Sequence, residues 1–326
     1  MRDRHPADAD RAAPGPWAWT ALGAAAFAAT WTVVALPVDA IQHAMAPVDR
    51  DPLAFFAVYA VPDARMLAAQ LARGALLALI LAPFRHVIAA HRRPQAMLFG
   101  VYFGLVVLGS VEPLPGSLEG WFYTETTLLG HALTAAAAAL QALAVTWILG
   151  RVLTKVGPRA ARPKADATGW GRYARFVALH AATYLAMGLL FMTLQDYAGA
   201  FATQPRFAWF RPLDDPWVAA AVPAQIPRGL LLAACAMPFL PALMRRRHGW
   251  ALLFALLFGT TALAAPSVLP GLLGATPNAS GPGALLTGLP EVATQMLTFS
   301  VLFVAWERRR AHPPARRPRR RQPITR

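Results

Sequence analysis

The sequence contains little of what soluble enzymes use for chemistry. Cysteine occurs once, at Cys235, which excludes an intramolecular disulfide and a cysteine-based metal cluster. No H-E-x-x-H, G-x-S-x-G, phosphate-binding or dinucleotide-binding motif is present. Charged residues are also scarce, at 14% of the chain against about 25% in soluble proteins. We therefore predict no catalytic residue, no metal and no cofactor, and we favour a non-enzyme over an enzyme.

Apolar residues replace the missing charge. They make up 56% of the chain, and the mean hydropathy is +0.41. Runs of about 20 apolar residues can cross a bilayer as helices. We predict an all-α integral membrane protein with eight transmembrane helices, at 17–37, 66–84, 96–111, 127–149, 174–194, 224–243, 249–265 and 289–306. The first run could pass for a signal peptide, but its counterpart in the second half is internal, so we expect an uncleaved helix.

The two halves of the chain resemble each other. At a shift of 155, residues 69–84 match residues 224–239 at nine of sixteen positions, and Arg73 falls on Arg228. A bias toward alanine and leucine does not align arginine, glutamine and proline as well. We therefore predict two tandem four-helix repeats. Because four is even, the copies face the same way, related by a pseudo-two-fold axis along the membrane normal.

Lysine and arginine are concentrated in alternate loops. They gather after the second, fourth and sixth predicted helices and in the C-terminal tail, whereas the other loops are mostly acidic or uncharged. Such residues mark cytoplasmic loops, so both termini are predicted to be cytoplasmic. The composition fits a bacterial inner membrane. The predicted parts are a cytoplasmic N-terminus, a first repeat, a basic cytoplasmic linker, a second repeat and a basic cytoplasmic tail, at 1–16, 17–151, 152–169, 170–309 and 310–326.

The same distribution accounts for the formal charge of +15 without a nucleic-acid partner, because no DNA- or RNA-binding motif accompanies it. The expected partners are the lipid bilayer, anionic lipid at the basic tail and a small-molecule ligand.

Ionisable side chains inside predicted spans mark function by default. Arg73 and Arg228 each follow a glutamine by three residues, so each pair shares a helix face. At 1.5 Å per residue, Arg73 lies about 18 Å from Arg85, in the outer half of the bilayer. The fourth and eighth helices supply a second polar patch at similar depth. The candidate ligand-binding residues are Arg73, Arg228, Gln70, Gln225, His131, Glu291, Thr127, Thr287, Thr134, Thr294 and Glu125.

These residues suggest a polar cavity that is open to the outside. Glu291 is a candidate partner for Arg228, whereas Arg73 would need an anionic ligand or one of three acidic residues of the third loop, Glu112, Glu119 or Glu125. A structural role stays open, in which each arginine satisfies helix-end carbonyls. The segment 112–123 is interpreted as a surface turn with an aromatic anchor, in preference to a re-entrant loop.

The leading functional prediction is a transporter or permease-like protein for a small solute, including an anionic one. The alternative is a non-transporting membrane sensor or an assembly module. A membrane enzyme is third, with Glu291, His131 and Glu125 as its acid–base groups.

Overall fold

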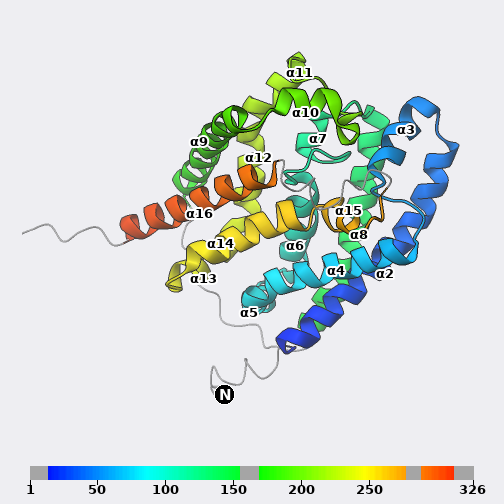
Figure 1. Ribbon diagram of the computed structural model, residues 1–326. Coiled ribbons are helices and arrows are strands. Elements are labelled where there is room, and N and C mark those ends of the chain that lie inside the picture. Colours follow the sequence, from blue (N-terminus) through cyan, green and yellow to red (C-terminus); the bar gives the residue numbers. More distant parts are fainter. Residues whose placement is uncertain (1–13, 155–168, 277–287, 312–326) are drawn as a thin grey trace, which may run out of the picture.

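A computed structural model describes residues 14–154, 169–276 and 288–311 (Figure 1). Within these ranges the chain is helical and contains no β-strand. The predicted N-terminus, linker and tail lie mostly outside them. The elements are α2 (Pro16–Ala44), α3 (Pro47–Phe56), α4 (Ala64–Leu81), η1 (Ala82–Phe84), α5 (Arg85–Ala90), α6 (Pro94–Phe99), η2 (Gly100–Leu108), α7 (Leu118–Tyr123), α8 (Leu128–Thr154), α9 (Trp170–Leu194), α10 (Tyr197–Thr203), η3 (Pro205–Phe207), α11 (Pro216–Ala219), α12 (Ala221–Ala236), η4 (Met237–Phe239), α13 (Leu240–Arg245), α14 (Gly249–Phe258), η5 (Gly259–Leu263), α15 (Val268–Leu272) and α16 (Leu289–Ala311).

Six helices in the described residues are long and apolar enough to cross a membrane. They are Pro16–Ala44, Ala64–Ala90, Leu128–Leu153, Trp170–Leu194, Ala221–Arg245 and Leu289–Ala311. Two further apolar helices, Pro94–Leu108 and Gly249–Leu263, are shorter. Every predicted span is therefore helical, and the third and seventh are the short ones. The finding nevertheless supports six spanning helices where eight were predicted.

The two short helices change from α to π at a glycine. The change occurs at Gly100, where η2 begins, and at Gly259, where η5 begins. At their ends, Gly109 N–H donates to the Gly104 carbonyl at 2.8 Å, and Ala264 N–H donates to the Gly259 carbonyl at 2.9 Å. Such π segments are rare and occur frequently at functional sites. In this protein, each π segment ends at a carbonyl group that accepts a hydrogen bond from a buried arginine.

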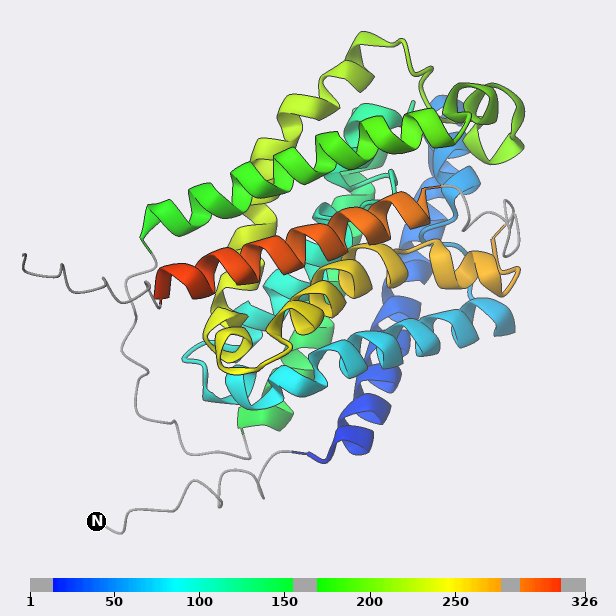
Figure 2. The same cartoon turned by 60° about the vertical axis from the view of Figure 1, so that its left-hand side comes forward.

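The helices pack around one apolar core that includes residues of both halves. In the first half α2 packs on α4 and α8, and in the second half α9 packs on α12 and α16. Figure 2 shows α9, α16, α14 and α4 side by side. The halves meet where η2 contacts α12 and η5, and where η5 contacts α4. Deep in this core Phe84 packs edge-on against Phe239, with ring centroids 4.8 Å apart.

A glycine pair brings α2 and α4 into close contact beside Arg73. A Cβ atom added to Gly74 would lie 2.6 Å from Phe27 Cβ and 2.7 Å from the Gly23 carbonyl oxygen. Small residues allow membrane helices to approach this closely. The contact places the Arg73 guanidinium over the Phe27 ring, 5.1 Å from its centroid.

Alternate connections gather at opposite ends of the bundle. At one end, Thr127 donates to Asp49 at 2.5 Å, and Glu125 N–H donates to the Trp209 carbonyl at 3.0 Å. At the other end, Glu307 of α16 accepts from Arg172 and Arg175 of α9, at 2.8 and 2.7 Å. The end that contains Glu307 is therefore the arginine-rich one.

Candidate functional site

A cavity with a volume of about 600 Å³ lies at the end of the bundle that carries α3, α7, α10 and α15. Its walls come from both halves of the chain. The first half contributes the segment 111–123 and aromatic side chains of α3, and the second half contributes α9, α10, α12, α15 and α16. Most of the wall is apolar, with Phe55, Phe56, Phe207 and Phe210 among its aromatic residues. A cavity of this size and lining is typical of a small-molecule site.

Arg228 of α12 lies in the wall of this cavity, with 2% of its surface exposed. Its Nη1 lies 3.2 Å from Glu119 Oε1 and donates to Gln225 Oε1 at 3.1 Å. Its Nη2 donates to the carbonyl of Gly109, at the end of η2, at 3.0 Å. Gln225 Nε2 in turn donates to Glu119 at 3.0 Å. Arg228 therefore has an internal counter-ion and also satisfies a carbonyl that the end of a helix leaves unpaired.

Glu291 lines the same cavity but does not pair with Arg228 as the sequence suggested. It accepts a hydrogen bond from Tyr197 of α10 at 2.5 Å. Glu119 takes the expected place because α7 packs on α12 and inserts its carboxylate there. The interpretation of segment 112–123 as a surface turn is therefore wrong, since Glu119 is 4% exposed and Ser117 is 5% exposed.

Glu112 is a second carboxylate in the cavity wall. Its Oε2 atom is buried and has no hydrogen-bond partner. Burial raises the pKa of Glu112 from 4.5 to about 7, although a backbone hydrogen bond from Ser267 and the positive charge of Arg73 oppose the shift. The carboxyl group therefore loses its proton at a higher pH than an exposed glutamate does.

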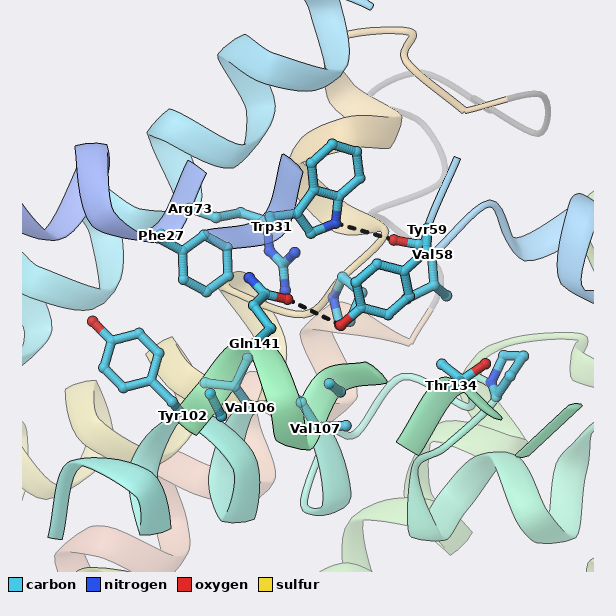
Figure 3. Close-up of a pocket in the computed structure, with 14 residues that line it drawn as sticks. Phe27, Trp31, Val58, Tyr59, Arg73, Tyr102, Val106, Val107, Thr134 and Gln141 are labelled. Carbon is cyan, nitrogen blue, oxygen red and sulfur yellow. Dashed lines mark hydrogen bonds between the residues drawn. The ribbon is translucent and has the colours of Figure 1, made fainter. Parts of the chain in front are cut away.

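Arg73 lies in the wall of a different cavity, of about 30 Å³ (Figure 3). Its Nε and Nη2 donate to the carbonyl of Ala264, at the end of η5, at 3.2 and 3.0 Å. Its Nη1 donates to Gln70 Oε1 at 2.8 Å. Arg73 and Arg228 therefore bind helix-end carbonyls in the opposite half of the chain. The two arginines are 155 residues apart, and so are Gly109 and Ala264.

Of the polar patch predicted on the fourth helix, only Thr134 lines the small cavity with Arg73. His131 Nδ1 accepts from Gly116 N–H at 3.0 Å, and its ring packs edge-on against Trp121. Thr134 donates to the carbonyl of Gly130 in its own helix. Although Thr134 lines the small cavity, His131 does not, so His131, Arg73, Arg228 and Glu291 do not meet in one cavity.

The remaining candidates are also dispersed. Thr127 binds Asp49, Thr294 donates to the Pro290 carbonyl of its own helix, and the side chain of Glu125 is exposed. Thr287 lies outside the described residues.

Sequence reasoning missed the tyrosines of the large cavity. Tyr123 and Tyr184 lie with their hydroxyl oxygens 3.2 Å apart, and Tyr197 binds Glu291. Burial and the charge of Glu119 raise the pKa of Tyr123 to about 12. A tyrosine near the end of an apolar run is also the usual interfacial anchor, so the sequence offers no signal that separates the two roles.

Neither metal-ligating side chains nor similarity to known proteins assigns a function to these residues. In the described part of the chain, no group of three or more His, Cys, Asp or Glu side chains is placed to hold a metal ion. No known protein family, curated protein or solved structure matches this chain.

Proposed function

We propose that the chain is a permease-like, multi-pass membrane protein whose outward-facing cavity binds a small solute with an apolar body. The observation that supports this function is the cavity of about 600 Å³, which has an apolar lining and a few polar groups. Because both halves of the chain form its walls, a movement of one half against the other would open or close it. Such movement between repeats around a fixed site is how many transporters work.

The proposed architecture is two parallel four-helix repeats, with eight membrane helices in all. The reciprocal hydrogen bonds of Arg73 and Arg228 to equivalent carbonyls support it. The short helices of each half also share the same change to π geometry. The arginine-rich end is proposed to be cytoplasmic, in a bacterial inner membrane, so the large cavity would face outward.

The charges of the cavity favour a neutral or cationic solute over the anionic one that the sequence suggested. Glu119 already neutralises Arg228. The carboxyl groups of Glu112 and Glu291 then remain in the wall against one further cation, Arg206, and Glu112 has one oxygen without a partner. A solute with an N–H donor or a positive charge would interact favourably with these carboxyl groups, and a carboxylate would not.

A second candidate is a membrane sensor or an assembly module that binds the solute without moving it. The packed apolar core favours this reading, because tightly packed groups such as Phe84, Phe239, Phe299 and Phe303 lie between the cavity and the arginine-rich end. A transporter would have to open this core during its cycle.

A matched pair of probes tests the proposed site. We expect 1-naphthylmethylamine to raise the Tm of the purified protein in lipid nanodiscs, and 1-naphthoate to have a much weaker effect. Glu291→Gln should reduce the response to the amine, whereas Thr294→Ser, a change outside the cavity lining, should leave it intact. An equal response to both probes, or to none, argues against the site. Uptake of the bound probe into proteoliposomes then separates a permease from a sensor.

A further inference from the structure

The geometry points to a binding site for one small monovalent anion, of the size of chloride, in the cavity of about 30 Å³ below Arg73. This site is separate from the large cavity and does not depend on the proposed solute function. It is formed mainly by α2, α4, η2, α8 and the residues just before α4.

The cavity has the size of a single small ion. A water molecule needs about 10–15 Å³ of such volume, so the space accommodates about two waters or one halide. The rings of Phe27, Trp31 and Tyr59 form much of the wall. Figure 3 shows the guanidinium of Arg73 extending between these rings toward the amide of Gln141. A charged group in such surroundings is poorly solvated and needs a partner.

The polar part of the wall offers mainly donors. A guanidinium has five N–H groups. The hydrogen bonds of Arg73 to Ala264 and Gln70 leave the second N–H of each terminal nitrogen unused. Tyr59 donates to Gln141 Oε1 at 3.0 Å, which fixes the amide so that its nitrogen is the free group. Gln141 Nε2 is buried and has no partner.

A comparison with Arg228 shows what Arg73 lacks. Arg228 has the carboxylate of Glu119 at 3.2 Å, whereas Arg73 makes no ion pair among the described residues. The position equivalent to Glu119, 155 residues later, is Gly274, and the second half has no acidic residue in that loop. The other groups that act on Arg73 electrostatically are Tyr59 and Glu112. A bound anion would therefore supply the counter-ion that the sequence omits.

Water molecules would match the wall of the small cavity less well than an anion would. Water molecules can donate to the hydroxyl oxygens of Tyr59 and Thr134 and to the second lone pair of Gln141 Oε1, but they leave the charge of Arg73 unbalanced. An anion brings acceptor capacity and no donor, so it matches free N–H groups of Arg73 and Gln141.

Halide-dependent stability tests the site. The protein in lipid nanodiscs is dialysed into sodium gluconate, and sodium chloride or bromide then replaces gluconate at constant ionic strength. We expect a saturable rise in Tm, of about 2 °C at tenfold excess over the dissociation constant. Gln141→Glu keeps the acceptor for Tyr59 but replaces the free N–H groups with negative charge, so the rise should disappear.

Gln42→Glu is the matched control, because it places the same charge in a buried position of α2 that does not line the cavity. It should keep the halide response. No response in the wild-type protein, which is the result for a cavity that holds only water, would overturn the proposal. So would a response that survives in Gln141→Glu, or one that is lost equally in Gln42→Glu. Naphthylmethylamine binding in the large cavity should be unchanged by Gln141→Glu.

Discussion

Arg73 and Arg228 occupy equivalent positions and make equivalent contacts with the backbone, but their charges are balanced differently. Each donates to a glutamine three residues earlier and to a helix-end carbonyl in the other half. Among the described residues, only Arg228 of the two has a carboxylate in contact, that of Glu119. The difference teaches that the same buried cation can have its charge balanced by a contacting carboxylate in one half and lack such a partner in the other.

The largest expected effect is on stability at the Arg228 site. Arg228→Met leaves Glu119 buried without a counter-ion, and breaking a buried pair in this way costs about 3–5 kcal/mol. Arg73→Met leaves no contacting carboxylate uncompensated and should cost less, about 1.5–3 kcal/mol for the lost charged hydrogen bonds. Unfolding in sodium dodecyl sulfate measures both. Equal losses of stability in the two variants would contradict the difference between the two arginine sites.

The pairing itself can be isolated by a double-mutant cycle. Glu119→Gln combined with Arg228→Met should be less destabilised than the sum of the two single variants, by about 1–3 kcal/mol. Gln70→Leu combined with Arg73→Met serves as the neutral counterpart, and its coupling should be smaller. Additive costs at the first pair would show that Glu119 and Arg228 do not stabilise each other.

Protonation of Glu112 should tune the anion site. Burial raises the pKa of Glu112 to about 7, so its negative charge appears as the pH rises through 7. It faces Arg73 and the backbone N–H of Ser267. The charged form repels an anion beside Arg73, so chloride affinity should fall about threefold to tenfold between pH 6 and pH 8, the effect of about 1 kcal/mol. Glu112→Gln should bind chloride with little pH dependence; a fall as steep as in the wild type would exclude Glu112 as the cause.

The smallest effect on stability is expected from a substitution of Tyr197. Tyr197→Phe removes the hydrogen bond to Glu291 and should lower the free energy of unfolding by about 0.5–1.5 kcal/mol. The halide response should not change, because neither residue lines the small cavity. Tm measurements with and without chloride provide both results. A lost halide response would mean that the two cavities are coupled.

The sequence predicted helices well because membrane helices depend on local apolar length. The runs that contain Trp31, Leu77 and Phe299 are all helical, and the two shortest runs are the short helices. It also marked Arg73 and Arg228 correctly as buried polar residues. These features follow from composition and spacing along one segment.

The partners of those residues could not be predicted, because they come from other segments. Glu119 reaches Arg228 only when α7 packs on α12, and spacing along the chain gives no sign of this. His131 and Glu291 are aligned in the sequence, yet one binds the Gly116 N–H and the other binds Tyr197. The change to π geometry at Gly100 and Gly259 also has no sequence signal, since glycine suits many backbone conformations.

Anomalous diffraction from crystals grown in sodium bromide tests the unequal charge balance most directly. The expected result is one bromide peak in the small cavity, near Arg73 and Gln141, with no peak beside Arg228, whose charge Glu119 already neutralises. An empty small cavity, or bromide peaks of equal height at both arginines, would contradict it.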